Sequence, residues 1–220
     1  MVEQLIYAAA GLLSYLAGSV PFGYLAVRLR TGRDIRTLGS GNIGATNAAR
    51  VLGAGWFLPV FALDFLKGFA PVFWMAPWVA RTWPCPICPQ LKVSLALWFG
   101  ACAAAGHLWP VFLGFKGGKG VATLAGILAA LNWAAALIGL GVWLAVFLPF
   151  RYVSLASVAA AVAVPAAHHL TAAGVRGRWE APGIITISLA GAALLVVWRH
   201  RGNLKRLAAG TEGRFGRKGP

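Results

Sequence analysis

Apolar segments alternate with short polar gaps along the whole chain, and the gaps hold almost all of the charge. The apolar segments cover residues 5–27, 56–79, 93–113, 121–131, 133–150, 153–170 and 183–198. A helix crosses the hydrocarbon core of a bilayer with about 20 residues, within a range of about 17 to 25. Five segments reach or approach that length, and we find neither an internal repeat nor a soluble domain. The pattern predicts an all-α polytopic membrane protein in which residues 1–220 form a single integral-membrane domain.

The stretch from residue 121 to residue 150 is ambiguous. As one helix it would be about 45 Å long at about 1.5 Å per residue, which is too long for one crossing and short for two full ones. If the chain turns near Asn132, fifteen of the twenty basic residues lie on one side of the membrane and four on the other. Because basic loops stay in the cytoplasm, this division favours the turn. We therefore expect seven transmembrane helices, two of them short, with the N-terminus outside and the C-terminus cytoplasmic.

Composition supports a membrane protein and excludes two other classes. Hydrophobic residues make up 59% and charged residues 11% of the 220 positions, whereas a soluble domain is about a quarter charged. The mean hydropathy is +0.72. Twenty basic residues stand against five acidic ones, which gives a net charge of +15. Nucleic-acid-binding proteins carry such charge on a soluble domain. We therefore expect no nucleic acid, but anionic membrane lipids and an anionic substrate as partners.

The first polar gap holds a glycine-rich segment, loop one, which spans residues 38–50 and reads LGSGNIGATNAAR. Its GxGxxG spacing does not indicate a dinucleotide site, because no strand precedes it and the following acid, Asp64, lies in an apolar helix. Glycines nevertheless let backbone N–H groups turn toward a phosphate, and Arg50 can bind phosphate oxygens in a bidentate way. Further donors in the loop are Ser40, Gly41, Asn42, Thr46 and Asn47. The alternative is a polar turn between two helices.

A second basic, glycine-rich segment, loop three, spans residues 106–123 and reads GHLWPVFLGFKGGKGVAT. It departs from a P-loop at two positions, because Leu113 replaces the first glycine and Gly120 replaces the hydroxyl residue after the lysine. The magnesium-binding hydroxyl is therefore absent. What remains is a helix N-terminus near Gly120, preceded by small residues and cations, namely Lys116, Gly117, Gly118 and Lys119. Such a terminus binds anions, and at the rim of a membrane the anion can carry a lipid tail.

Three sets of polar residues lie within or beside the apolar segments, and the first two allow two interpretations each. His107 is either a structural group or a general base. Asp64 and Lys67 lie three apart on one helix, and they either neutralise each other or serve a function within the membrane. Arg151 and Ser154 lie at the beginning of the sixth helix, where the helix dipole and hydroxyl groups favour an anion.

Two further pairs lie elsewhere. His200 and Asn203 follow the seventh helix and share one helix face, from which they can reach toward the loops. Cys85 and Cys88 form a lone CxxC pair, a weak zinc signal because structural zinc takes four ligands; an incidental role and a disulfide are the alternatives. The chain has no HxxxxD acyltransferase motif, no GxSxG motif and no acidic cluster. We therefore expect no metal and no cofactor, and a reaction that relies on hydrogen-bond donors, cations and an already activated substrate.

Five motifs occur in a specific order along the chain. They are GSGNIGATNAARVLG at 39–53, DFLKG at 64–68, GHLWPVFLGFKGGKGVAT at 106–123, RYVSLAS at 151–157 and RHRGNLKRLAAGTE at 199–212. On these motifs the chain closely resembles the acyl-phosphate-dependent glycerol-3-phosphate acyltransferases of bacterial membranes, the PlsY family. The resemblance implies a seven-helix enzyme of the bacterial cytoplasmic (inner) membrane with its active site on the cytoplasmic face. It also implies transfer of a fatty acyl group from acyl phosphate to the 1-hydroxyl of glycerol 3-phosphate, which gives lysophosphatidic acid and inorganic phosphate.

The resemblance assigns roles as well. It makes Ser40 and Arg50 of loop one the leading candidates for residues that activity requires. It associates loop three with acyl-phosphate binding, and His200 and Asn203 with the C-terminal part of the site. The expected catalytic residues are Ser40, Arg50, His107, His200 and Asn203. The expected substrate-binding residues are Gly41, Asn42, Thr46, Asn47, Lys67, Lys116, Gly117, Gly118, Lys119, Gly120, Arg151 and Ser154. The proton acceptor stays open among His107, His200 and a phosphate oxygen of the substrate. A transporter for a phosphorylated solute and a lipid-binding scaffold are the competing classes.

Overall fold

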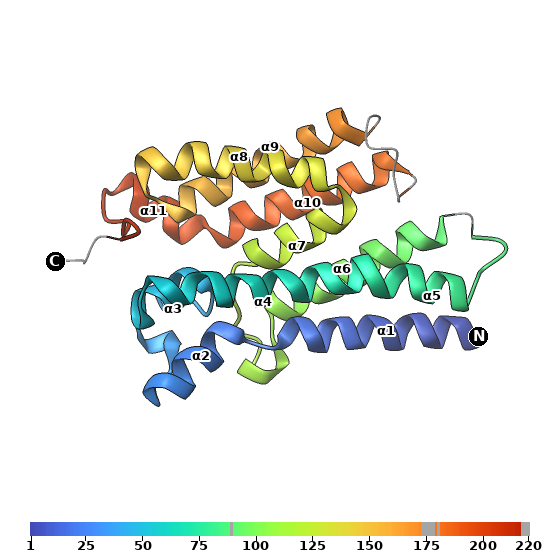
Figure 1. The fold of residues 1–220 in the computed structure, drawn as a ribbon, viewed down its shortest axis with the longest axis horizontal. Coiled ribbons are helices and arrows are strands. Elements are labelled where there is room, and N and C mark those ends of the chain that lie inside the picture. The colour runs from blue at the N-terminus through green and yellow to red at the C-terminus, as the bar shows by residue number, and fades with distance from the viewer. Residues whose placement is uncertain (89, 173–178, 180, 217–220) are drawn as a thin grey trace. The chain divides into compact units, whose positions relative to one another are not determined.

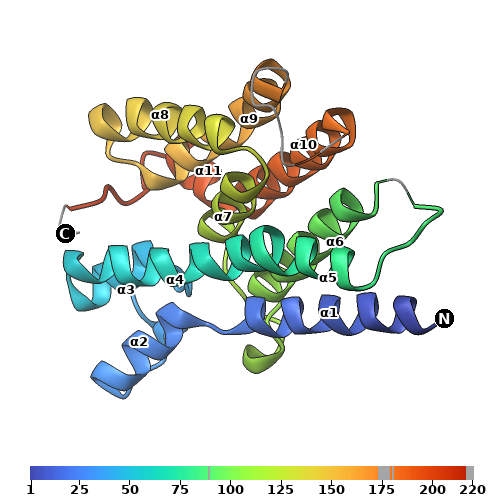
Figure 2. The same ribbon diagram turned by 45° about the vertical axis from the view of Figure 1, so that its right-hand side comes forward.

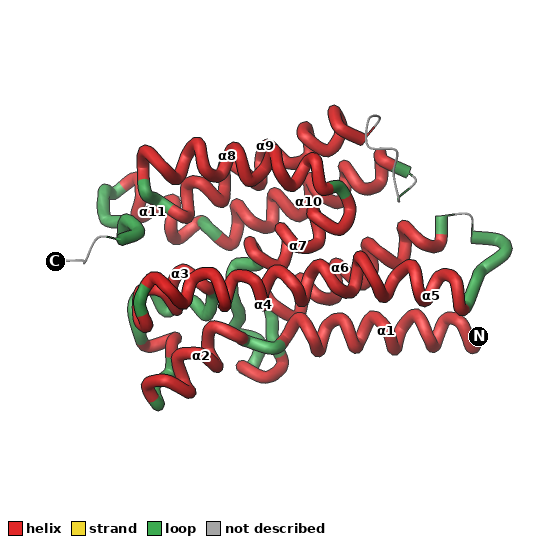
Figure 3. The backbone as a smooth tube through the Cα atoms, viewed as in Figure 1, coloured by secondary structure: helices red, strands yellow, loops and turns green. Residues whose placement is uncertain are grey.

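The computed structural model describes residues 1–88, 90–172, 179 and 181–216. These residues form helices, turns and loops, and no strand occurs among them (Figure 1, Figure 3). In chain order the α-helices are α1 (Val2–Ser19), α2 (Phe22–Thr31), α3 (Ala45–Leu52), α4 (Phe57–Ala70), α5 (Ala76–Thr82), α6 (Leu91–Leu108), α7 (Val121–Leu131), α8 (Trp133–Phe150), α9 (Val153–Ala172), α10 (Pro182–Arg199) and α11 (Arg201–Ala208). The shorter elements are the 3-10 turns η1 (Ile35–Thr37), η2 (Ala54–Trp56) and η4 (Val111–Leu113) and the π-helical turn η3 (Pro71–Met75).

Helices long and apolar enough to cross a membrane recur along the chain. Among the described residues there are six such stretches, namely Val2–Thr31, Ala54–Thr82, Leu91–Leu113, Trp133–Phe150, Val153–Ala172 and Pro182–Arg199. Helix α7 is apolar as well, but it has only 11 residues. These six stretches and α7 coincide in position with the seven predicted segments. The prediction of a multi-pass, all-helical membrane protein is therefore confirmed.

The first predicted segment, residues 5–27, is not one continuous helix, so that prediction is wrong in detail. Helix α1 ends at Ser19, and α2 begins at Phe22. Pro21 accounts for the break, since proline has no N–H donor and keeps the residue before it out of the helical conformation. Val20 is accordingly extended, with a ψ of 116°.

The interruption predicted near Asn132 is confirmed, because this single residue separates α7 from α8. Asn132 is extended, and its Oδ1 accepts a hydrogen bond from the backbone N–H of Ala135 at 3.0 Å, which caps the start of α8. Its Nδ2 donates to Thr171 Oγ1 at 2.9 Å and lies 3.0 Å from His168 Nδ1. The buried amide has partners on both α8 and α9, and these contacts fix where α7 ends and α8 begins. The reversal of chain direction at this residue stays a prediction.

The chain divides into two compact units. Unit 1 comprises Met1–Leu131 and Arg178–Ala181, and unit 2 comprises Asn132–Gly177 and Pro182–Pro220. Within unit 1, α1 packs along α6 and α4 packs along α7. Within unit 2, α8 packs on α9 and α9 on α10, which Figure 2 shows as three neighbouring helices.

Glycines allow the helices of unit 1 to approach closely. A Cβ atom at Gly18 would collide with the carbonyl oxygen of Ala103 on α6, so only glycine fits that contact between α1 and α6. A Cβ atom at Gly68 on α4 would likewise collide with the carbonyl oxygen of Thr123 on α7. Small residues are typical of such helix contacts in membranes, where close van der Waals packing drives association. The close approach at Gly68 holds the first turn of α7, and with it the end of loop three, against α4.

Candidate active site

Asn47 organises loop one from within. Its side chain, on α3, is only 1% exposed. Its Oδ1 accepts a hydrogen bond from the backbone N–H of Ser40 at 2.8 Å. Its Nδ2 donates to three backbone carbonyls, those of Leu38 and Asn42 at 2.9 Å each and that of Ile35 at 3.3 Å. One buried amide thus fixes the path of the backbone on both sides of Ser40.

Glycines are required where loop one turns. Gly39 and Gly41 have φ angles of 56° and 70°, a region that residues with a side chain rarely adopt. A Cβ atom at Gly39 would also collide with Oδ1 of Asn47. After the turn, Oδ1 of Asn42 accepts the backbone N–H of Gly44 at 2.9 Å, just where α3 begins. The glycine spacing therefore shapes a compact turn and is unrelated to dinucleotide binding.

The candidate residues of loop one separate into two kinds. The amides of Asn42 and Asn47, both predicted to contact substrate, are directed to the loop itself. Ser40 and Arg50 are exposed, the first in the turn and the second in the last turn of α3, while Thr46 is half-buried in the first turn of α3. The loop therefore presents a hydroxyl and a guanidinium on a backbone that the buried amides hold in place.

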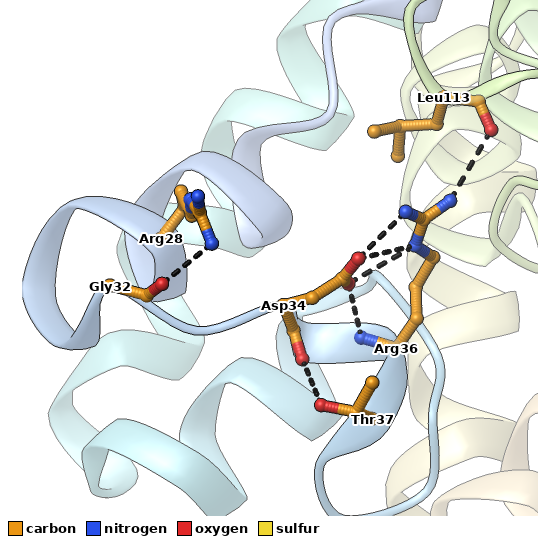
Figure 4. Close-up of polar contacts among 6 residues, drawn as sticks. All are labelled: Arg28, Gly32, Asp34, Arg36, Thr37 and Leu113. Carbon is orange, nitrogen blue, oxygen red and sulfur yellow. Dashed lines mark hydrogen bonds and ion pairs between the residues drawn. The ribbon is translucent and has the colours of Figure 1, made fainter.

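Arg36, two residues before loop one, links that end of the loop to loop three. Its guanidinium pairs with the carboxylate of Asp34 at 2.7 Å, and its Nη1 donates to the carbonyl of Leu113 at 3.4 Å (Figure 4). The Leu113 side chain belongs to one buried apolar cluster with Ile35 and Ile43. Hydrogen bonds from Arg36 hold the pKa of Asp34 below its ordinary value, because they favour the ionised carboxylate. The two glycine-rich segments, far apart in sequence, therefore lie together in unit 1.

Loop three folds back on the end of α6. This helix ends at Leu108, not at residue 113 as the hydropathy pattern predicted. The backbone N–H of Gly118 then donates to the carbonyl of His107 at 3.1 Å. Helix α7 begins at Val121, next to the predicted start at Gly120, whose φ of 83° favours glycine. The fold thus returns the glycines of the loop to the helix that precedes them.

Cations flank this helix start. Lys116 is exposed and Lys119 is half-buried. A helix N-terminus offers unpaired N–H groups and a positive dipole end, and nearby cations add to its attraction for an anion. The structure brings together the three features from which the anion site was predicted, namely the helix start, the glycines and the lysines.

Buried charges lie beneath loop three, inside unit 1. Nζ of Lys67 lies 2.8 Å from Oδ1 of Asp64, and both side chains are at most 4% exposed. The same Nζ donates to the carbonyl of Val20 at 3.0 Å, at the break between α1 and α2. Nδ1 of His107 lies 3.7 Å from the same Asp64 oxygen. The predicted mutual neutralisation of Asp64 and Lys67 is confirmed, and the ammonium of Lys67, predicted to bind substrate, is directed to protein groups.

A second polar cluster gathers around Glu212 in unit 2. Ser154 Oγ and Asn203 Nδ2 donate to its Oε1 at 2.7 and 2.6 Å. Arg206 Nε donates to its Oε2 at 2.9 Å, and the Glu212 side chain is 6% exposed. Glu212 ends the last of the five motifs, but the sequence predicted no role for it. Its rarity was the available signal, since it is one of only five acidic residues in the chain.

The pKa of Glu212 is set by two opposing effects. Burial raises it, but the hydrogen bonds from Asn203, Ser154 and Arg206 outweigh burial and lower the pKa below its ordinary value. A carboxylate whose folded-state pKa is lowered stabilises the fold above its unfolded pKa, about 4.3 for glutamate, and loses that contribution as the pH falls through the folded value.

We therefore expect Glu212→Gln to unfold more easily than the unsubstituted protein at pH 7, with a difference that shrinks as the pH falls below about 4. Thermal unfolding in detergent across this range measures it. Glu3→Gln is the matched control, because Glu3 is 53% exposed and pairs with the N-terminal amine at a distance of 3.9 Å. A difference between Glu212→Gln and the parent that does not change with pH would contradict this role of the ionised carboxylate.

The remaining candidates of unit 2 are His200 and Arg151. His200 is 3% exposed at the start of α11, and its Nδ1 lies 2.8 Å from the carbonyl of Val196. Arg151 ends α8 in a left-handed conformation with a φ of 61°, and its guanidinium lies over the ring of Phe147, 5.4 Å from the centroid. Of the predicted site residues, Arg151, Ser154, His200 and Asn203 therefore belong to unit 2, and the others belong to unit 1.

The lone cysteine pair takes the disulfide alternative and not the incidental role. Cys85 and Cys88 form a disulfide in the segment between α5 and α6. Among the residues that the structure describes, no group of three or more His, Cys, Asp or Glu side chains gathers that could hold a metal ion.

Known proteins resemble this chain along nearly its whole length. The family model described as glycerol-3-phosphate acyltransferase matches residues 8–210. The glycerol-3-phosphate acyltransferase of Mesorhizobium japonicum is 43% identical over 205 residues, which cover 93% of this chain and 94% of the relative. That of Desulforudis audaxviator is 45% identical over 203 residues, which cover 92% of each chain.

Solved structures agree with the sequence comparison. The crystal structure of PlsY (YgiH), an integral membrane glycerol 3-phosphate acyltransferase, in its glycerol 3-phosphate form matches with a TM-score of 0.78 at 38% identity and covers 96% of both chains. The lysophosphatidic acid form of the same protein matches with a TM-score of 0.74 at 36% identity, covering 96% of this chain and 95% of the other.

Proposed function

The chain belongs to the glycerol-3-phosphate acyltransferase family, and we propose that it transfers a fatty acyl group from acyl phosphate to the 1-hydroxyl of glycerol 3-phosphate. The products are lysophosphatidic acid and inorganic phosphate, and the reaction is the first step of bacterial phospholipid synthesis. The observation that carries the proposal is the pair of glycine-rich, cationic loops joined by Arg36 and a shared apolar cluster in unit 1. Two phosphorylated substrates require two anion-binding elements, and these loops supply them.

Acyl phosphate suits the chemistry of the residues present. It is a mixed anhydride with a good leaving group, so neither ATP nor a metal ion is needed to activate it. The start of α7, with the backbone N–H of Gly120 and the cations of Lys116 and Lys119, would hold the departing phosphate, while the N–H of Gly118 is directed to the carbonyl of His107. Such groups stabilise negative charge as it develops, and they need no reorganisation at the moment of reaction.

Loop one would hold the acceptor. Arg50 and Ser40 are its exposed polar groups, and with Thr46 and the backbone N–H of Gly41 they would bind the phosphate of glycerol 3-phosphate. Asn47 and Asn42 would contribute by shaping the loop. Binding both substrates in one orientation converts a bimolecular reaction into an effectively unimolecular one, which lowers the barrier without a covalent enzyme intermediate.

Unit 2 carries its own candidate residues, near the starts of α9 and α11. His200 and Asn203 are assigned to the acyl-transfer centre, and Arg151 and Ser154 to the substrate phosphates. The 1-hydroxyl proton passes to His107, to His200 or to a phosphate oxygen of the substrate. The pH dependence of the rate in His107→Ala and His200→Ala separates these acceptors. Replacing the true base removes its ionisation from the pH–rate profile, whereas replacing any other residue leaves that ionisation in place.

We also propose the topology that the charges favour. The six long stretches and α7 would form seven crossings in one integral-membrane domain of the bacterial inner membrane, with the N-terminus outside and both loops on the cytoplasmic face. The support is that fifteen of twenty basic residues then lie inside. Membrane lipids would surround the exposed apolar side chains of α8, among them Leu137, Leu140 and Leu148.

One assay tests the reaction. Purified protein in detergent receives labelled glycerol 3-phosphate with either acyl phosphate or acyl coenzyme A as the donor. We expect lysophosphatidic acid and inorganic phosphate in equal amounts with acyl phosphate. Product from acyl coenzyme A alone would contradict the proposed donor, and absence of product with both would contradict the proposed function. Uptake of labelled glycerol 3-phosphate into proteoliposomes without any acyl donor would instead support the transporter.

A further inference from the structure

The last described residues of the chain return to the turn between α8 and α9. The backbone N–H of Phe215 donates to the carbonyl of Arg151 at 2.8 Å. Nε of Arg214 donates to the hydroxyl of Tyr152 at 3.2 Å, across 62 positions of sequence, and its guanidinium lies over the same ring. We call residues 213–216 the C-terminal strap. Terminal residues stay with a domain only where such contacts tie them down, so the strap is a built part of unit 2.

The turn that the strap contacts has an unusual backbone conformation. Arg151 follows the last residue of α8 with a φ of 61° and a ψ of 18°. Residues with a side chain rarely adopt this left-handed conformation, and helices that end in it usually have glycine there. The N–H of Arg151 donates to the carbonyl of Phe147 at 2.8 Å, and its own carbonyl accepts the N–H of Phe215. The backbone of Arg151 is thus held on one side by α8 and on the other by the strap.

The side chain of Arg151 depends on the strap as well. Its guanidinium lies over the ring of Phe147, 5.4 Å from the centroid, which is a cation–π contact. The Phe147 ring stacks on Trp143 with centroids 4.5 Å apart and meets the ring of Phe215 edge to face with centroids 5.9 Å apart. Nη2 of Arg151 also lies 3.6 Å from the position that a Cβ atom at Gly216 would take. The ring that holds the guanidinium is therefore itself held by the strap.

Such contacts matter for an arginine that binds a solute. The side chain of Arg151 is exposed, so a solute can reach its guanidinium. An arginine loses much rotamer freedom when it binds a ligand, and this loss weakens the binding. Contacts that restrict the side chain beforehand reduce the loss. The strap therefore acts on the one property of Arg151 that its binding to a phosphate requires, which is a fixed orientation of the guanidinium.

We propose that the C-terminal strap orients Arg151 toward the substrate phosphates, with Phe215 as a positioning residue that acts through the Phe147 ring and through the Arg151 carbonyl. This deepens the proposed function and rests on it for the kinetic test alone. Two consequences follow from the geometry. Phe215 affects catalysis only while the Arg151 guanidinium is present, and another aromatic ring at position 215 can replace it.

A double-mutant cycle tests this dependence. We expect Phe215→Ala to lower kcat/KM for acyl transfer about five- to twentyfold and Phe215→Tyr, which keeps the ring, to retain most of the activity. In Arg151→Ala, the same Phe215→Ala change should lower kcat/KM by less than about twofold. Leu140→Ala is the control for loss of an apolar side chain from unit 2, because Leu140 is 52% exposed on α8, and its rate should stay within about twofold of the parent. Equal losses from Phe215→Ala in both backgrounds, or near-parent activity of Arg151→Ala, would overturn the proposal.

Hydrogen exchange gives a readout that does not depend on the reaction. Backbone amides of residues 147–153 should exchange faster in Phe215→Ala than in the parent and in Leu140→Ala, while those of residues 38–44 should not change. Arg214→Ala is the milder second variant, because it removes an exposed contact and leaves the aromatic rings in place; its effect on the same amides should be smaller. Unchanged exchange at residues 147–153 in both variants would refute the strap even if the parent protein makes no lysophosphatidic acid, an outcome that would refute the proposed function alone.

Discussion

Arg50→Ala is expected to lower kcat/KM for acyl transfer by about a hundred- to a thousandfold while the protein stays folded. Arg50 is exposed in the last turn of α3, so its removal leaves the buried interior of loop one unchanged. A bidentate guanidinium–phosphate contact consists of two charge-assisted hydrogen bonds, each worth about 1.5–3 kcal/mol. Initial rates with both substrates varied, together with the melting temperature in detergent, measure the two parts of this prediction.

Arg50→Lys is the informative companion. Lysine keeps the positive charge but loses the planar fork, so part of the activity should return. If Arg50→Ala retained activity within about fivefold of the parent, the guanidinium would not be a phosphate ligand. If both variants melted well below the parent, Arg50 would instead have a structural role, and its assignment to the site would fail.

Asn47→Leu is expected to abolish activity through loss of the shape of loop one. Leucine has the same branching and number of side-chain heavy atoms, but it leaves the N–H of Ser40 and three backbone carbonyls without the partner that the amide supplies. A buried polar group left unpaired costs about 1–3 kcal/mol, so the native turn should no longer be the most stable conformation of this segment. Rates and hydrogen exchange over residues 38–44 measure the effect.

Asn132→Leu is the matched control for this variant. Asn132 is also a buried asparagine, with an N–H donor on its Oδ1 and two partners at its Nδ2, but it lies at the start of α8 in unit 2. We expect it to lower the melting temperature by an amount similar to Asn47→Leu and to keep near-normal activity per folded molecule. If the two variants lost activity to the same extent, Asn47 would matter only for global stability.

Segment length and charge predicted the main architecture, but proline was underweighted. The interruption at Asn132 followed from a stretch too long for one crossing and from the division of basic residues. The break at Pro21 was missed because residues 5–27 are continuously apolar, and hydropathy does not register a missing N–H donor. The end of α6 at Leu108 was misplaced for the same reason, two residues before Pro110.

The candidate site was predictable where its chemistry is local in sequence. Loops one and three carry their glycines, cations and helix start in short runs, so the prediction that both bind anions can be made from the sequence alone. Glu212 was missed because its partner Ser154 is 58 positions away, and no pattern in one sequence pairs them. The inward orientation of Asn47 is equally invisible, since its amide is as suitable for a phosphate as for a carbonyl.

Each loop is proposed to hold one of the two phosphorylated substrates, and a pair of steady-state measurements decides whether the site is divided in this way. KM for glycerol 3-phosphate and KM for acyl phosphate would be determined for Arg50→Lys and for Lys119→Gln. We expect crossed effects: Arg50→Lys raises KM for glycerol 3-phosphate about tenfold or more, and Lys119→Gln raises KM for acyl phosphate to a similar extent, each with the other constant nearly unchanged. If both variants raised KM for the same substrate, or neither raised either, the division of the site between the two loops would be contradicted.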